Sequence, residues 1–154
     1  KDLPPLESAK IIIAHVANGV RLAKKYALPP ILIEFIRTHH GTTRAEYFYR
    51  QYKNEHPDDT TNDHFFAYTG PRPRTREEAI LMIADSLEAA SRSLVNPTTI
   101  DIDTLVDNII RGKVANAQLN DANLSFRELE TIKVIFKQLL KSIRHARVAY
   151  PTAV

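Results

Sequence analysis

The sequence predicts a single all-α domain with about six helices. Apolar residues recur at spacings of three and four over most of the chain, which is typical of helices that bury one face. Two segments open with the Ser/Thr-x-x-Glu pattern of a capping box, and no segment alternates polar and apolar residues for long enough to form a strand. The 154 residues, 44% of them hydrophobic, suit one domain with its own core.

The first predicted helix covers residues 8–27 and ends before Pro29 and Pro30, which cannot continue it. Pro30 suits the first turn of a second helix, where a missing N–H costs nothing, and Gly41 follows that helix as a C-terminal cap. Both helices have an apolar face that we expect to be buried. These faces comprise Ile11, Ile12, His15, Val16, Gly19, Val20, Leu22 and Ala23 in the first helix, and Ile31, Leu32, Phe35 and Ile36 in the second.

The middle of the chain is predicted as a helix, a loop and a further helix. Residues 43–55 are aromatic and charged, and we expect a helix with its aromatic side chains partly inside. Residues 56–74 gather Pro, Gly, Asp and Asn, which indicates a long flexible loop. Loops of this length in compact domains are usually functional or disordered. Residues 75–94 return to helical periodicity and open with a capping box, Thr75 with Glu78.

Two more helices complete the prediction. Residues 98–112 follow a proline and end near Gly112. Residues 125–151 open with a second capping box, Ser125 with Glu128, and continue amphipathically to a proline.

Composition narrows the classes of function. The chain has no cysteine, so any metal ion must be held by His, Asp or Glu. The net charge of +3 suits an anionic ligand, but the charges alternate in sign and form no basic block, so we expect no nucleic-acid partner. No apolar run approaches the ~20 residues of a membrane span, so we expect this piece to be soluble and cytoplasmic.

Two polar residues fall on apolar helix faces. His15 lies among isoleucines and valines, and a buried imidazole needs partners for both nitrogens. It is either a core histidine bonded to a backbone carbonyl or a metal ligand. Asp85 is flanked one turn away by Leu81 and Met82, where a carboxylate is costly unless a cation meets it. Its alternatives are a salt bridge to Arg92, an N-cap to another helix and a metal site.

His39 and His40 close the second helix in the stretch "ILIEFIRTHHG". Taken alone they suit a helix C-terminus, where the dipole favours imidazolium. Adjacent helical residues point about 100° apart, so both rings reach one ion only if the backbone bends. Gly41 supplies such a bend. Together with His15 and Asp85, the doublet brings metal-type ligands onto three separate helices.

Several of these segments resemble one known family. The stretches "IIIAHVANGVRLAKKYALP", "FIRTHHGTT", "GPRPRTREEAILMIADSLEAASRSL" and "HARVAYP" are similar to the cytoplasmic HD domain of the bacterial seven-transmembrane HD family, whose studied members hydrolyse cyclic di-AMP. The similarity runs over essentially the whole chain. It implies a phosphodiesterase that converts cyclic di-AMP to linear pApA.

The resemblance also implies a metal site with two divalent ions, usually iron or manganese. His15, His39 and His40 match the three histidines that hold one ion, and Asp85 matches the late aspartate that holds the other. The family's upstream histidine and its His-Asp pair have no counterpart, since no His-Asp dipeptide occurs in residues 1–154. We therefore expect a partial HD domain, its C-terminal portion, with at most one well-ligated ion and no activity on its own.

The implied substrate is a dianion, so we expect hydrogen-bond donors near the metal site to contact its phosphates. Arg92 shares a helix face with Asp85 and could meet a phosphate bidentately, although it could equally be a plain surface arginine or the partner of Glu88. Gly41, Thr42 and Thr43 could offer backbone or hydroxyl donors, and Tyr47 could stack on an adenine.

Two other functions remain open at this stage. One is an HD-type phosphohydrolase of another nucleotide, either cyclic di-GMP or an alarmone related to guanosine tetraphosphate. The other is a non-catalytic helical module that binds a nucleotide or a protein. The resemblance further implies a full-length protein in the bacterial inner membrane, with this domain on the cytoplasmic face and an extracellular sensor part, and it allows an oligomer.

Overall fold

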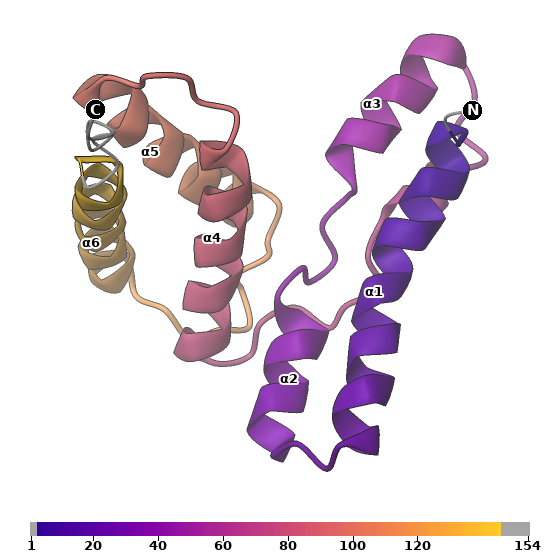
Figure 1. The fold of residues 1–154 in the computed structure, drawn as a ribbon, viewed down its shortest axis with the longest axis horizontal. Coiled ribbons are helices and arrows are strands. Elements are labelled where there is room, and N and C mark those ends of the chain that lie inside the picture. Colours follow the sequence, from indigo (N-terminus) through magenta and orange to yellow (C-terminus); the bar gives the residue numbers. More distant parts are fainter. Residues whose placement is uncertain (1–2, 146–154) are drawn as a thin grey trace, which may run out of the picture.

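In a computed structural model, the chain folds into α-helices and one 3-10 helix (Figure 1), and the structure describes residues 3–145. The elements in this range are α1 (Pro5–Lys25), α2 (Pro30–Thr38), α3 (Glu46–Glu55), the 3-10 helix η1 (Asp63–Phe66), α4 (Arg76–Ser91), α5 (Thr99–Ala115) and α6 (Phe126–His145). Over these residues there is no strand, so the all-α prediction is confirmed. The predicted continuation of the last helix to Pro151 lies outside the described residues.

The helices form two groups that meet through α2 and α4 (Figure 1). In the first group, α1 contacts α2, α3 and η1. In the second, α5 packs between α4 and α6. Because the histidine doublet directly follows α2, it lies where the two groups meet.

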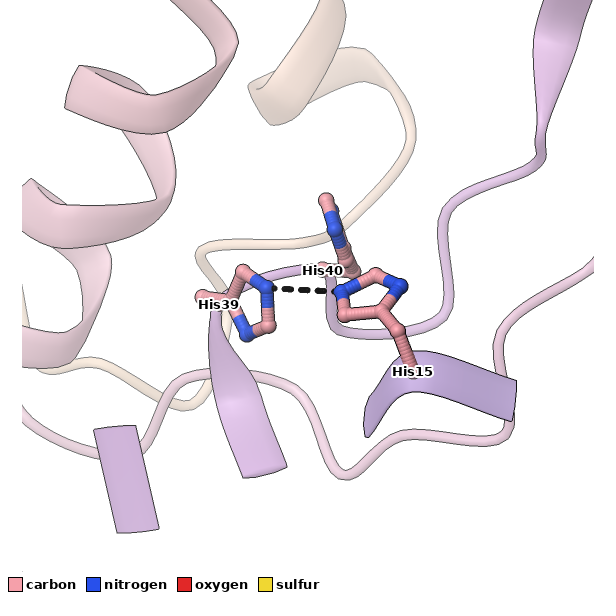
Figure 2. Close-up of side chains that lie close together, drawn as sticks. All are labelled: His15, His39 and His40. Atoms are coloured by element: carbon pink, nitrogen blue, oxygen red, sulfur yellow. Dashed lines mark hydrogen bonds between the residues drawn. The ribbon is translucent and has the colours of Figure 1, made fainter. Parts of the chain in front are cut away.

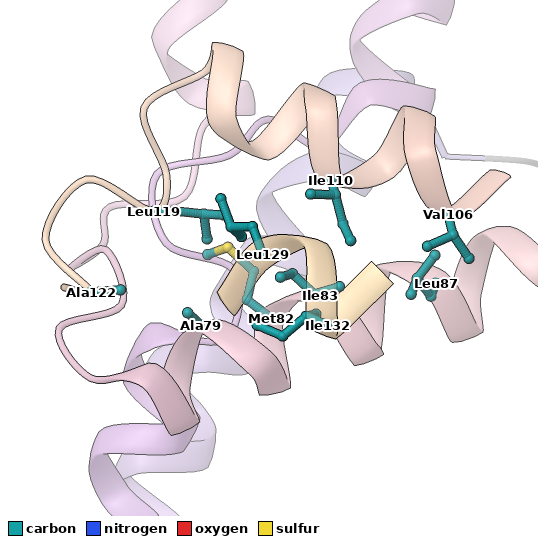
Figure 3. Close-up of a cluster of buried hydrophobic side chains, with 10 residues drawn as sticks. All are labelled: Ala79, Met82, Ile83, Leu87, Val106, Ile110, Leu119, Ala122, Leu129 and Ile132. Atoms are coloured by element: carbon teal, nitrogen blue, oxygen red, sulfur yellow. The ribbon is translucent and has the colours of Figure 1, made fainter. Parts of the chain in front are cut away.

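The larger hydrophobic core belongs to the second group (Figure 3). Its buried residues are Ala79, Met82, Ile83, Leu87, Val106, Ile110, Leu119, Ala122, Leu129 and Ile132. Burying one large aliphatic side chain fully contributes about 1.5–3 kcal/mol to the free energy of unfolding. This cluster therefore contributes more to stability than the smaller one in the first group. A smaller cluster of Ala9, Tyr52 and Phe66 joins α1, α3 and η1.

The predicted burial of the α1 and α2 apolar faces is wrong at several positions. The exposed fractions are 62% for Ile11, 55% for Leu22 and 64% for Ile31. Of the predicted α1 face only Ala23 is buried, and the other buried position of this helix is Ala9. Periodicity identifies a helix, but the number of neighbours that cover it depends on tertiary packing.

Residues 56–74, expected as a flexible loop, contain η1 and two buried aromatic residues, Phe66 and Tyr68. Backbone hydrogen bonds tie this segment to the chain that follows the histidine doublet. Ala45 N–H donates to the Phe66 carbonyl at 2.7 Å, and Tyr68 N–H donates to the Thr43 carbonyl at 2.8 Å. These bonds place Tyr68 beside the doublet.

The two predicted capping boxes differ in the structure. Ser125 and Glu128 form both reciprocal bonds, so this prediction is confirmed. The Thr75 hydroxyl accepts from the Glu78 N–H, but the Glu78 carboxylate accepts from the Arg74 N–H at 2.7 Å instead of closing the box.

Gly41 has a left-handed backbone, with φ of +54°, and lies against the second group. A Cβ atom at this position would be 2.5 Å from Gln118 Oε1 and 2.7 Å from Met82 Cε. Only glycine allows both this conformation and this approach. The prediction of a bend at Gly41 is confirmed.

We expect Gly41→Ala to lower the free energy of unfolding by about 2–4 kcal/mol, because it adds left-handed strain and displaces the buried Met82. Urea denaturation of the two proteins measures the difference. Gly112→Ala is the matched control, since a Cβ there meets no atom within 4 Å and alanine favours the helix. Equal losses in both variants would contradict the assigned role of Gly41.

Candidate metal centre

His15 and His39 point their rings at each other from α1 and the end of α2 (Figure 2). His15 Nδ1 contacts the carbonyl of Ile12, and His39 Nδ1 contacts the carbonyl of Ile36 at 2.8 Å. A carbonyl oxygen only accepts, so each Nδ1–H is the donor. The helix backbone thereby orients both rings and leaves Nε2 free to act as a ligand.

The Nε2 atoms of His15 and His39 are 3.2 Å apart. With hydrogen on both Nδ1 atoms, their lone pairs face each other, which is favourable only if a proton or a cation lies between them. Two nitrogen ligands about 2.1 Å from one ion, at roughly a right angle, have about this separation. The donor chemistry therefore fits a metal ion.

His40 completes a cluster of three imidazoles, which we call the histidine cluster: His15, His39 and His40. One ligand atom from each lies within 4.8 Å of the others. The His40 ring is 4.0 Å from the His39 ring and 4.9 Å from the His15 ring, between centroids. Burial, followed by the charges of His39 and His15, lowers the pKa of His40 to about 3. The ring is therefore neutral at physiological pH, as a ligand must be.

Asp85 brings a carboxylate from α4 to the edge of this cluster. Its Oδ2 is 3.8 Å from His40 Nδ1, and its side chain is 42% exposed. The structure does not pair Asp85 with Arg92, whose guanidinium bonds Glu88 at 2.8 Å. α1, the C-terminal end of α2 and α4 thus place the four predicted metal-type ligands near one another, with Asp85 beside His40 and the three histidines within 4.8 Å of one another.

Tyr68 covers the His40 ring, stacked at 4.3 Å between centroids with an interplanar angle of 22°. It is buried, and burial, followed by the charge of Asp85, raises the pKa of its hydroxyl to about 12. The neutral Tyr68 ring therefore covers one face of the His40 ring.

Hydrogen bonds hold the two threonines after the doublet against the rest of the protein. The Thr42 N–H donates to Gln118 Oε1 at 2.9 Å, and Gln118 Nε2 donates to the Thr42 hydroxyl at 2.9 Å. The Thr43 hydroxyl donates to the His40 carbonyl at 2.6 Å. These bonds fix the path of the backbone just beyond the histidine cluster.

Two predicted substrate contacts lie on the surface. The Arg92 side chain is 75% exposed and paired with Glu88, which is the surface alternative considered for it. Tyr47 on α3 is 69% exposed, and its hydroxyl accepts from Gln51.

Two cavities lie near the centre, and one of its histidines, His40, lines only the smaller. The smaller, of about 390 Å³, is lined by α1 together with Arg37, His40, Gly41 and Tyr68. The larger, of about 940 Å³, has Thr42 and Thr43 in its wall. We call this second hollow the larger cavity; it is large enough for a nucleotide-sized ligand.

Sequence reasoning missed three residues beside the centre: Tyr68, Gln118 and Lys113. Tyr68 was assigned to the loop, and nothing in its local sequence indicates that it stacks on His40. Gln118 follows a helix end, 76 residues after its partner Thr42. Lys113 reads as an ordinary basic residue in the last turn of a helix.

Comparisons with known proteins agree with this architecture. A model of the HD domain family matches residues 1–90. The cyclic-di-AMP phosphodiesterase PgpH of Bacillus subtilis is 39% identical over 151 residues, and PgpH of Listeria monocytogenes is 36% identical over 149 residues. These alignments cover 98% and 97% of this chain but only 21% and 20% of the relatives, so the chain spans about a fifth of their length.

Solved structures show the same fold. The crystal structure of the L. monocytogenes PgpH HD domain in complex with cyclic-di-AMP has a TM-score of 0.87 and 34% identity, covering 92% of this chain and 65% of that one. A second structure of that domain has a TM-score of 0.84 and 32% identity. No helix within residues 3–145 is long and apolar enough to cross a bilayer. Given its match to the family model and its fold, this chain belongs to the HD domain family.

Proposed function

We propose that this chain is the C-terminal portion of a phosphodiesterase domain that hydrolyses cyclic di-AMP to linear pApA at a centre with two divalent metal ions. The observation that carries the proposal is the convergence of His15, His39, His40 and Asp85. The similarity to PgpH, whose HD domain has been solved in complex with cyclic-di-AMP, supports this choice of substrate.

In this proposal the histidine cluster holds one ion, either iron or manganese, and Asp85 contributes to the other. The remaining ligands, a histidine and a His-Asp pair, come from residues that precede Lys1. No His-Asp dipeptide occurs in the 154 residues, so this chain by itself has at most one well-ligated ion and no turnover. Bound divalent ions would activate water for attack on phosphorus and would neutralise phosphate charge.

The chain's own residues prepare that chemistry. Backbone carbonyls in α1 and α2 hold the His15 and His39 rings, and Tyr68 holds the His40 ring. In the reaction, water adds to one phosphorus atom, the bond to the 3′ oxygen breaks, and that oxygen takes a proton. Thr42 and Thr43 form part of the wall along which the dinucleotide lies.

We further place this domain on the cytoplasmic face of the bacterial inner membrane, within a longer protein that has membrane-spanning and extracellular parts. The resemblance to the seven-transmembrane HD family supports this location. The chain also spans only about a fifth of its curated relatives, which leaves room for such parts.

The substrate is tested by adding cyclic di-AMP, cyclic di-GMP and guanosine tetraphosphate separately to the full-length protein with Mn²⁺. We expect conversion of cyclic di-AMP to pApA, identified by chromatography and mass spectrometry. Turnover of another nucleotide without cyclic di-AMP would replace the substrate. Binding of a nucleotide without turnover, with metal present, would favour a non-catalytic module.

The metal assignment predicts that His15→Gln and His39→Gln each weaken Mn²⁺ binding by at least about tenfold, because each removes an oriented nitrogen ligand. Isothermal titration calorimetry on the 154-residue chain measures the affinity. His56→Gln is the control, since this exposed histidine lies outside the cluster and should leave binding unchanged. Unchanged affinity in both cluster variants would refute the assignment.

The lowered pKa of His40 predicts acid sensitivity of the metal-free protein. In the unfolded chain this ring titrates near 6.5, but in the folded chain near 3, so the unfolded state binds the extra proton in between. The stability that depends on a neutral His40 ring is fully present above pH 6.5 and is lost progressively as the pH falls toward 3. At pH 5 the loss approaches about 2 kcal/mol.

Urea unfolding with a chelator at pH 7.5 and pH 5.0 measures this effect. We expect the wild-type protein to lose more stability over this interval than His40→Gln, which cannot take up the proton. Identical losses would show that His40 titrates normally in the folded protein.

A further inference from the structure

Lys113 is a half-buried cation in the last turn of α5. Within residues 3–143, whose side chains the structure describes, its ammonium makes no ion pair or hydrogen bond. Other lysines near α5 do have partners: Lys137 pairs with Asp107 at 2.9 Å, and Lys141 pairs with Asp103 at 2.6 Å. A buried ammonium without a partner is costly, so Lys113 is suited to meet an anion from outside the chain.

Lys113 lies in the wall of the larger cavity, which also contains two arginines. Those arginines are already engaged, because Arg44 and Arg50 share the carboxylate of Glu46 at 2.9 and 3.0 Å. Arg44 also stacks on the Tyr49 ring, 3.7 Å from its centroid. In the described part of this wall, Lys113 is therefore the Lys or Arg side chain that forms no salt bridge.

The side chains that the sequence predicts as phosphate donors already have hydrogen-bond partners within the protein. Arg92 bonds Glu88 on the surface, and protein groups occupy the hydroxyls of Thr42 and Thr43. None of these three is free to meet a dianion without breaking an existing bond.

Lys113 interacts electrostatically with His40 and Asp85. Burial lowers the pKa of Lys113, and the charge of Asp85 opposes that change. Lys113 in turn is one of the charges that lower the pKa of His40, after burial and the two other histidines. Lys113 thus lies in the wall of the larger cavity and near enough to His40 and Asp85 for their charges to interact.

We propose that the Lys113 ammonium binds a non-bridging oxygen of the phosphate that is hydrolysed, and so positions the dinucleotide between the larger cavity and the histidine cluster. This inference rests on the proposed function, since it names the residue that holds its substrate. A single charged hydrogen bond of this kind is worth about 10-fold to 100-fold in affinity.

The test compares Lys113→Met and Lys113→Arg in the full-length protein loaded with Mn²⁺, measuring Mn²⁺ content, KM, kcat and nucleotide affinity. Lys113→Met should raise the KM and Kd for cyclic di-AMP by at least about tenfold, and Lys113→Arg should restore most of the loss. Metal content and affinity for uncharged adenosine should not change in either variant. Lys24→Met, in the last turn of α1 and outside both cavity walls, is the control.

The outcomes separate this inference from the proposed function. If the wild type hydrolyses cyclic di-AMP and Lys113→Met has unchanged KM and Kd, the role of Lys113 is refuted while the function stands. Equal losses for adenosine and cyclic di-AMP, or loss of metal, would show a merely structural role. If the wild type binds another nucleotide instead, comparing wild type, Lys113→Met and Lys113→Arg with that nucleotide decides the role of Lys113. If the wild type binds no nucleotide, both proposals are overturned.

Discussion

Gly41 lies where the two helical groups come within van der Waals distance, and the geometry of the metal centre depends on this approach. Helix α2 ends at Thr38. The chain then turns at Gly41, whose backbone is left-handed, and passes so close to Met82 of the main core that Gly41 has no room for a side chain. That turn sets His39 and His40 against α1 and α4. It also directs Thr42 toward Gln118, whose hydrogen bonds hold the two groups together.

The centre is built mainly by backbone and aromatic contacts. Helix carbonyls position the His15 and His39 rings, and Tyr68 stacks on His40. Burial among other imidazoles keeps His40 neutral, which is the state that binds a metal. The same low pKa that keeps His40 neutral for metal binding is expected to make the metal-free protein less stable in acid.

Charge is distributed unevenly around this centre. Surface cations such as Arg92 pair with neighbouring glutamates and are screened by water, so they contribute little to binding. Lys113 is instead half-buried beside the larger cavity with no partner in the described part of the chain, close enough to influence both His40 and Asp85. Burial strengthens the interaction of such a cation with an anionic ligand, because the surrounding dielectric is low.

The helical class, most helix positions and the residue types of the centre follow from the sequence alone, because periodicity, prolines and glycine act locally. It identified His15, the doublet and Asp85 as unusual, and a family resemblance joined them. It could not show that Ile11 is exposed, that Tyr68 stacks on His40, or that Lys113 faces the larger cavity. Those properties depend on contacts between residues far apart in the chain, and only the packing of the two helical groups decides them.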